Sequence, residues 1–137
     1  WVPQSPTLVP GTILDNMGGL PLEDLETAAA ATGFDTVLAT TPDGWKTTIG
    51  TGGVGLSVGQ RQRLALTRTL AAHSQLVILD EPTAHLDAVS EETVVRAIDD
   101  MRREGRTVIV IAHRAAMMEA ADAVIAVRSA ADEEAHA

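Results

Sequence analysis

The sequence predicts an α/β protein in which a mostly helical first half is followed by a strand–helix–strand–helix–strand half with a parallel sheet. Three short apolar segments support this prediction: 76–79 (L-V-I-L), 107–111 (T-V-I-V-I) and 123–127 (A-V-I-A-V). Such runs are typical of strands that are buried on both faces. Segments with helical patterns separate them, and strands that alternate with helices imply right-handed crossovers and a parallel sheet.

The composition is that of a soluble globular protein. The 137 residues suffice for one domain with a core, and 45% of them are hydrophobic and 21% charged. The formal net charge of −9 argues against a general nucleic-acid binder and against a binder of anionic membranes. The chain has no Cys, which excludes disulfides and thiolate sites. No stretch approaches the roughly 20 apolar residues of a membrane span, and a start at Trp1 in place of Met suggests a processed or cut chain.

The first half is expected to combine helices with loops and to lack a good strand. Its clearest helix is Leu22–Thr32, because acidic side chains occupy the first turn and Gly33 follows the last residue. The other expectations are a Pro-rich loop over 1–11, a short helix that ends near Met17, a turn over 34–38 and a Gly-rich loop over 40–59.

The second half alternates predicted helices with the three strands. The clearest helix is 88–104, where Val94, Ile98 and Met101 form an apolar stripe and Gly105 marks the end. Two further helices are expected over 60–74 and 115–121, and the polar, Ala-rich tail over 130–137 is expected to fray.

Two carboxylates, Asp80 and Glu81, follow the first strand directly, and Pro82 then ends the pairing. They therefore lie at the carboxyl end of a buried strand, where open α/β sheets bind ligands. Their side chains point to opposite sides, so one can hold a hard cation such as Mg²⁺ while the other acts as a base on a reacting water. The simpler interpretation is that Asp-Glu-Pro begins a turn and caps the next helix.

A second candidate site is the sequence L-S-V-G-Q at 56–60, which leads directly into a predicted helix. A small hydroxyl residue and a glycine at a helix N-terminus leave free N–H groups and a positive dipole end open to an anion. Taken alone, Ser57 and Gly59 are better explained by an ordinary serine cap.

Taken together, these motifs resemble the nucleotide-binding domain of ABC transporters. Leu76–Asp80 is similar to the Walker B strand, with Glu81 as the catalytic glutamate; 84–87 is similar to the D-loop, and His113 in A-H-R to the switch histidine. The opening V-P-Q-S-P-T-L-V-P-G-T-I-L-D-N is similar to the Q-loop of the exporter branch, with Gln4 as its glutamine. The signature segment corresponds to Leu56, Ser57, Val58, Gly59 and Gln60, with Val58 where the family usually has its first glycine.

The resemblance implies ATP and Mg²⁺ as cofactors and a role for each residue at the sheet edge. Asp80 would orient the Mg²⁺ that bridges nucleotide phosphates, and Gln4 would contact the metal and the water. Glu81 would polarise the attacking water, and His113 would hydrogen-bond the γ-phosphate.

The resemblance also implies a partner, because family members dimerise head to tail around two nucleotides. The signature segment and Asp87 would bind the ATP of the opposite subunit, with Ser57 and Gly59 at its γ-phosphate. Arg61 and Arg63 follow on the same helix, and a solvated helix face is favoured for them over an RNA contact.

Two departures qualify the resemblance. No G-x-x-x-x-G-K-[S/T] occurs and the adenine-stacking aromatic is absent, so the chain resembles the C-terminal part of the domain, a partial P-loop NTPase (ABC ATPase) fold. Thr51 stands where exporters usually carry a Glu that contacts the membrane region.

His73 and His85 are interpreted as structural. The implied division is a Q-loop and helical part over 1–75, a Walker B part of the core over 76–129 and the tail over 130–137.

The expected function is the ATP-hydrolysing motor of an exporter, inactive as an isolated chain and coupled to a transmembrane domain at the cytoplasmic face of the inner membrane. The patterns T-A-H-L-D and L-S-x-G-Q-R-Q-R-L-A-L are most similar to bacterial cysteine/glutathione (thiol reductant) exporters. Two alternatives stay open: a non-transport ABC ATPase of the DNA-repair or translation kind, and a non-catalytic module that offers only the signature face. In the family the Walker A strand joins the same sheet, so the isolated chain is expected to expose an apolar edge and to self-associate or be only marginally stable.

Overall fold

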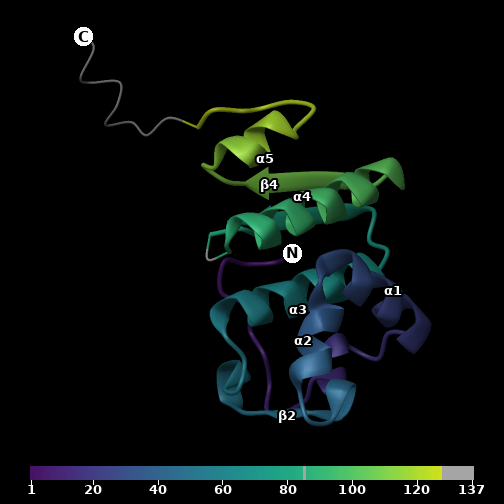
Figure 1. Ribbon diagram of the computed structural model, residues 1–137. Coiled ribbons are helices and arrows are strands. Elements are labelled where there is room, and N and C mark those ends of the chain that lie inside the picture. The colour runs from purple at the N-terminus through teal and green to yellow at the C-terminus, as the bar shows by residue number, and fades with distance from the viewer. Residues whose placement is uncertain (85, 128–137) are drawn as a thin grey trace.

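The computed structural model describes residues 1–84 and 86–127 (Figure 1). The fold is mixed α/β, as predicted, with a parallel strand pair and its covering helix at one end of the molecule and a short antiparallel pair at the other. In chain order the elements are β1 (Gly11–Thr12), η1 (Leu14–Met17), α1 (Leu22–Thr32), α2 (Phe34–Thr40), η2 (Gly44–Lys46), β2 (Thr48–Ile49), η3 (Thr51–Gly53), α3 (Val58–Ala71), β3 (Leu76–Asp80), α4 (Ala88–Arg103), β4 (Thr107–Ile111) and α5 (Ala115–Glu119).

The predicted helix Leu22–Thr32 is confirmed with the same bounds as α1. Gly33 ends α1 in the left-handed conformation, with φ 70°, and its N–H donates to the carbonyls of Ala29 and Ala30. A glycine adopts this conformation without the steric cost that a Cβ would add, which is why it closes helices so often. The chain then turns at once into α2, so the expected turn is a helix of its own.

The parallel strand pair is also confirmed. β3 and β4 pair in a register that sets Val77 beside Val108 and Leu79 beside Val110. The intervening α4 forms the crossover; Val94 and Met101 of its apolar stripe are buried, and Ile98 is partly buried. Asp80 belongs to β3, one residue beyond the apolar run from which the strand was predicted.

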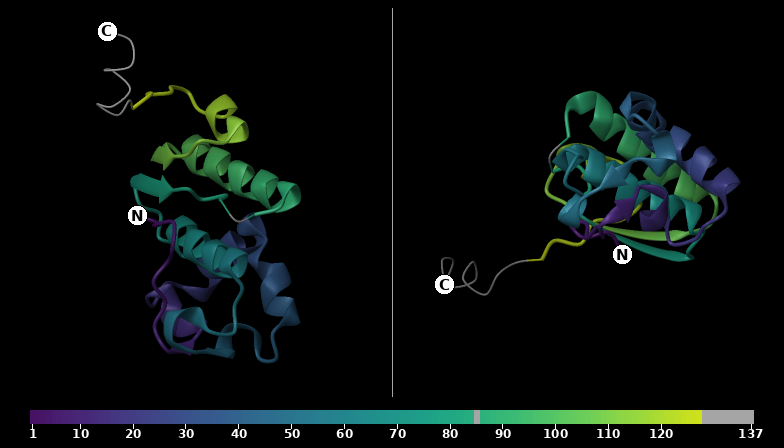
Figure 2. Two further views of the ribbon diagram at one scale, coloured as in Figure 1. Left: turned by 90° about the vertical axis from the view of Figure 1, so that its left-hand side faces the viewer. Right: turned by 90° about the horizontal axis from the view of Figure 1, so that it is seen from below.

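An additional chain segment lies along the other side of β3, where the sequence predicted only a loop with extended pieces. The N–H of Val2 donates to the Ile78 carbonyl at 2.8 Å, and the N–H of Asp80 donates to the Val2 carbonyl at 2.9 Å. Val2 thus forms a parallel bridge with Leu79. Figure 2 shows the N-terminus beside this strand. A single bridging residue has no periodicity, so no sequence pattern predicts this pairing.

The third predicted strand, 123–127, is wrong. These residues are irregular, and Ile125 and Val127 are almost fully exposed. Their β-branched composition suits a strand, but a strand forms only against the edge of another. Asp122 instead pairs with Arg102 of α4 at 2.9 Å, and no described strand runs alongside the segment that follows.

The other differences are smaller. α3 begins two residues earlier than predicted and ends at Ala71, and α5 ends at Glu119. β2 lies within the predicted Gly-rich loop and pairs antiparallel with β1, where Gly11 faces Ile49. Of the predicted tail, residues 130–137 lie outside the described residues, and the division of the chain at residue 75 stays a prediction.

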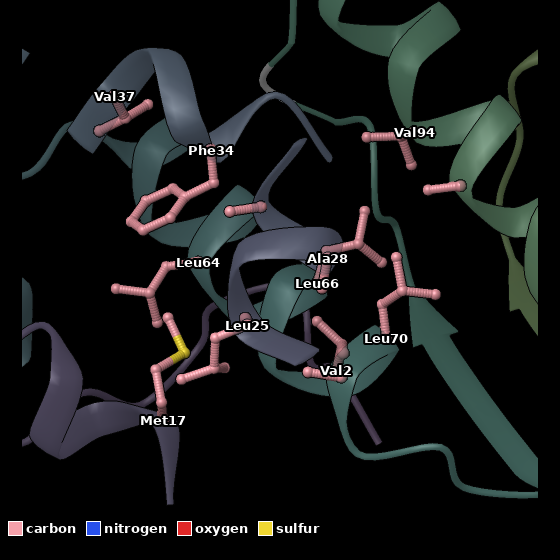
Figure 3. Packing of buried hydrophobic residues seen from close by; sticks show 14 of the residues in the cluster. Val2, Met17, Leu25, Ala28, Phe34, Val37, Leu64, Leu66, Leu70 and Val94 are labelled. Carbon is pink, nitrogen blue, oxygen red and sulfur yellow. The ribbon is translucent and has the colours of Figure 1, made fainter. Parts of the chain in front are cut away.

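The core is formed chiefly where α1, α2 and α3 meet. Leu25 of α1, Phe34 of α2 and Leu64 of α3 are fully buried, and Met17 lies beside them (Figure 3). The same cluster of buried residues continues through Leu70 and Val2 to the underside of β3 and to α4. One core therefore joins the helical part to the sheet and sets α3 directly beneath the strands.

We expect Leu64→Ala to lower the free energy of unfolding by about 2–5 kcal/mol, because it leaves a cavity among Phe34, Met17 and Leu25. Denaturant titration followed by circular dichroism measures this change. Val54→Ala is the matched control, since Val54 is 70% exposed and its truncation should change stability by no more than about 0.5 kcal/mol. Equal effects of the two substitutions would contradict the described core.

β4 has an exposed edge and an exposed apolar face. It pairs only with β3 among the described strands, and Ile109 and Ile111 on its outer face are 48% and 53% exposed. Parallel sheets normally bury both faces, and an unpaired apolar edge is a template for another chain.

We therefore expect the isolated chain to self-associate with rising concentration, which light scattering detects. Ile109→Lys should weaken the association, because it places a charge on the exposed face of β4, whereas Val89→Lys adds a charge at an exposed position of α4 and should not. A monodisperse monomer at high concentration with a high melting temperature would count against this expectation.

Candidate functional site

The carboxyl ends of β3 and β4 bring two of the predicted site residues into contact. Glu81 follows β3 and His113 follows β4 by two residues, and the parallel register places both ends at one edge of the sheet. His113 Nδ1 lies 2.8 Å from Glu81 Oε1. A carboxylate can only accept, so the imidazole Nδ1–H donates this hydrogen bond. The His113 ring is otherwise 77% exposed, which leaves its Nε2 accessible.

The backbone at Glu81 is unusual. Its φ is +50°, a left-handed conformation that costs a non-glycine residue about 1–3 kcal/mol. The N–H of Glu81 donates to the Ile111 carbonyl at 2.8 Å, so β4 holds the residue in this conformation. Its Oε2 is buried and has no hydrogen-bond partner among the described residues. Strain and an unpaired buried oxygen at one residue are typical of a functional position.

Gln4 lies at the same edge of the sheet. It follows Val2, which runs parallel to β3 and pairs beside Leu79, so the chain leaves the sheet at the end where Asp80 and Glu81 lie. The Gln4 side chain is exposed there. The structure thus gathers all four residues that the sequence assigned to this edge.

The residues at this edge fit a magnesium ion that is held partly by a ligand. In the described part of the chain, no group of three or more His, Cys, Asp or Glu side chains could hold a metal by itself. Mg²⁺ is commonly held by one or two carboxylates together with phosphate oxygens and water. Asp80 at the end of β3 and Gln4 at the same edge supply oxygen donors of this kind.

An ion pair anchors the loop that carries His113. Arg114 Nη1 lies 2.7 Å from Glu91 Oε2, in the first turn of α4. Both side chains are at least two-thirds buried, which limits the solvent screening of the pair. The pair ties the residue after His113 to the helix that follows Glu81.

The other predicted residues gather in an open groove of about 600 Å³ between α2, α3 and the start of α4. Two helix N-termini open into it, those of α3 and α4, and each brings free N–H groups and a positive dipole end. The lining residues are Thr36, Val37, Thr40, Ser57, Val58, Gly59, Gln60, Arg63, Leu86, Asp87 and Ser90.

Ser57 caps α3 through a reciprocal pair of hydrogen bonds. Its Oγ accepts from the Gln60 N–H at 3.2 Å, and its own N–H donates to Gln60 Oε1 at 2.8 Å. This capping box is the simpler interpretation of the sequence, and the structure contains it. The hydroxyl proton of Ser57 and the N–H groups of Val58 and Gly59 still have no intrahelical acceptor, so an anion can bind to them.

Asp87 caps α4 in the same groove. Its carboxylate accepts from the Ser90 N–H at 2.8 Å. Hydrogen bonds from the Ser90 backbone and side chain, together with the nearby Arg63 guanidinium, lower the pKa of Asp87 below 3.8, against a smaller opposing effect of burial. Arg63 also donates to Ser90 Oγ and, at 3.4 Å, to the Gly33 carbonyl, so it crosslinks three elements.

Several residues have other surroundings than the sequence suggested. Leu56 is buried in the core, so it can support the groove but does not line it. Arg63 lies inside the groove and not on a solvated face. His73 lies 2.9 Å from Arg106 and 3.7 Å from Asp24, consistent with a structural role. His85 lies outside the described residues.

The sequence analysis missed Gln62, a buried polar residue. The helical period of α3, which places Gln62 on the same face as Leu66 and Leu70, is the signal that could have identified it.

Comparisons with known proteins agree with these motifs. A family profile described as "ABC transporter" matches residues 1–84. The ATP-dependent lipid A-core flippase of Pseudomonas fluorescens is 43% identical over 129 residues, which cover 90% of this chain and 21% of the relative. The type I secretion system ATP-binding protein PrsD of Rhizobium meliloti is 40% identical, with 91% of this chain and 22% of the relative covered.

Among solved structures, a bacterial Atm1-family ABC exporter with ATP bound matches with a TM-score of 0.74 and 32% identity, over 85% of this chain and 21% of that one. The chain thus spans about a fifth of the length of these relatives. In the described residues no helix has the length and apolarity to cross a membrane.

The lowered pKa of Asp87 predicts part of the acid sensitivity of the fold. A folded-state pKa below the unfolded value contributes stability above about pH 4 that is lost as the pH falls through the folded-state pKa. Asp87→Asn keeps a side chain that caps well but does not titrate, so its stability should fall less below pH 4 than that of the wild type. Chemical unfolding from pH 6 to pH 2.5 measures this. Asp43→Asn is the control, because Asp43 precedes η2 without a side-chain cap bond. If the stability of Asp87→Asn falls below pH 4 as steeply as that of the wild type, the prediction is wrong.

Proposed function

This chain belongs to the ABC transporter family, and on that premise we propose that it carries the water-activating edge and the signature segment of the ATP-binding domain of an exporter. The contact between Glu81 and His113 at the carboxyl ends of β3 and β4 is the observation that supports this most directly. A carboxylate and an imidazole held together at the ligand-binding edge of a parallel sheet suit the activation of a water for phosphoryl transfer.

Glu81 is the proposed base that orients and polarises the attacking water. Its Oε1 accepts from His113, and its unpaired, buried Oε2 is available to accept from a water. The ion pair between Arg114 and Glu91 keeps His113 from turning away with its loop. His113 Nε2 then faces outward, and it can donate to a phosphate oxygen only when both ring nitrogens carry protons.

Asp80 and Gln4 are the proposed residues that would hold Mg²⁺. The ion, when bound, supplies charge neutralisation on the nucleotide phosphates. Asp80 ends β3 and is held there by the hydrogen bond from its N–H to the Val2 carbonyl, and Gln4 comes two residues after Val2. The backbone placement of Asp80 orients its carboxylate without a large ordering cost.

The signature segment is the proposed binding site for the phosphate of a nucleotide held by a second ATP-binding domain, arranged head to tail. Ser57 and Gly59 would contact the γ-phosphate, and Val58, Gln60 and Asp87 line the same groove. Leu56 supports the segment from the core. The substitution Val58 does not remove its backbone N–H, so the first turn keeps its donors.

Transport is proposed over the non-transport alternatives, because relatives that match over nine-tenths of this chain are named as a flippase and as a secretion system ATP-binding protein. The proposed partner is a transmembrane domain, which places this chain at the cytoplasmic face of the membrane. Cysteine or glutathione as the exported substrate rests on the T-A-H-L-D and L-S-x-G-Q-R-Q-R-L-A-L patterns alone, since the names of these relatives do not include a thiol compound.

A chimera tests the proposal. The aligned region of the Pseudomonas fluorescens flippase is replaced by this chain, and ATP hydrolysis is measured in detergent or liposomes. We expect an active chimera in which Glu81→Gln lowers kcat by a factor of about 10²–10⁴, as loss of a general base does.

The control is Glu92→Gln, which removes an exposed carboxylate that pairs with Arg96 on α4 at 2.6 Å and should leave kcat unchanged. An inactive chimera with Glu81 intact, or an active Glu81→Gln variant, would count against the proposed function.

A further inference from the structure

Gln62 connects the two parts of the candidate site. It lies on α3, five residues beyond Ser57, and is only 2% exposed. Its amide Nε2 donates to the backbone carbonyl of Glu81 at 2.9 Å. A buried glutamine thus spans from the helix that begins with the signature segment to the residue that carries the proposed base.

This hydrogen bond completes the restraint on the Glu81 backbone. The N–H of Glu81 is held by the Ile111 carbonyl of β4 at 2.8 Å, and its carbonyl accepts from Gln62 on α3 and from the Ala84 N–H at 3.2 Å. With φ at +50°, the residue is in a conformation that relaxes unless its surroundings hold it. The peptide group before its Cα is therefore held by β4, and the peptide group after it by α3. Together these two restraints orient the carboxylate toward His113.

Three of the four buried polar side-chain atoms that lack a partner in the described part of the chain lie at this junction. They are Gln62 Oε1, Glu81 Oε2 and Thr83 Oγ1. All three atoms belong to the residues that the hydrogen bond between Gln62 and the Glu81 carbonyl joins, or to the turn that follows Glu81.

We propose that Gln62 is a positioning residue for Glu81: its hydrogen bond from the signature helix α3 to the Glu81 carbonyl holds the proposed water-activating carboxylate of the same chain against His113. This inference rests on the proposed function for the roles of Glu81 and of the signature segment. A glutamine that merely satisfied a buried carbonyl would stabilise the fold without affecting the contact between Glu81 and His113.

The test is NMR on the ¹⁵N,¹³C-labelled chain of 137 residues. The readouts are the ring ¹⁵N shifts of His113 and the side-chain carboxyl ¹³C shift of Glu81, with Glu81→Gln as the reference for a His113 ring without its carboxylate. In Gln62→Leu, which removes the donor at similar volume, we expect the His113 ring shifts to move most of the way to the reference values. Gln62→Asn keeps the amide but shortens its reach, so it should show the same direction of change and serves if the Leu variant does not fold.

Thr67→Val is the matched control. Thr67 is fully buried on the same helix and lies 2.6 Å from Thr32 Oγ1, away from Glu81, and Thr32 retains its bond to the Ala28 carbonyl when Thr67 is replaced. It should lower stability and leave the His113 and Glu81 shifts unchanged. Wild-type shifts of His113 and Glu81 in a folded Gln62→Leu or Gln62→Asn variant would overturn the positioning role. An active Glu81→Gln chimera would instead overturn the proposed function, so the two failures are distinguishable.

Discussion

The parallel ladder between β3 and β4 is the interaction on which the rest of the structure depends. Because the two strands run in the same direction, both release their chains at one edge, and residues 32 positions apart in sequence meet there as Glu81 and His113. The ladder is extended by Val2 on the far side of β3, which delivers Gln4 to the same edge. A one-residue slip in either pairing would move every side chain to the opposite face and separate the carboxylate from the imidazole.

The helix α3 is the second organising element, and burial contributes more to its placement than its cap does. Leu64, Leu66 and Leu70 are almost fully buried, and each contributes about 1.5–3 kcal/mol of hydrophobic stabilisation, against roughly 1 kcal/mol for a capping residue. The apolar face thus fixes where α3 lies, and the cap fixes where it begins. Its first turn opens into the groove while Gln62, a turn later, reaches the carbonyl of Glu81.

The elements that the sequence predicted correctly are those that local signals determine. α1, β3 and β4 were placed to within a residue because end signals and apolar runs are properties of the segment itself. That Glu81 and His113 lie at one edge followed from strand direction, whereas their direct contact was not predicted. The segment 123–127 failed for the opposite reason: Val124 and Ile125 have the composition of a strand, but strand formation depends on a partner elsewhere in the chain. The left-handed backbone of Glu81 and its bond to Gln62 are likewise non-local, since a glutamate shows no preference for positive φ.

The charge of the chain limits how the proposed phosphate contacts can work. A net charge of −9 opposes the approach of a nucleotide, but at physiological ionic strength exposed charges are screened over about 8 Å, so the groups within the groove decide its potential. There the one guanidinium among the lining residues, Arg63, lies beside Asp87 and donates to Ser90, so its charge is largely compensated. The attraction for an anion then comes from the free N–H groups and the dipole of α3, which carry no counter-charge of their own. Backbone donors of this kind do not depend on the side chain at their position, which is why Val58 in place of the family's glycine is compatible with phosphate binding at the signature segment.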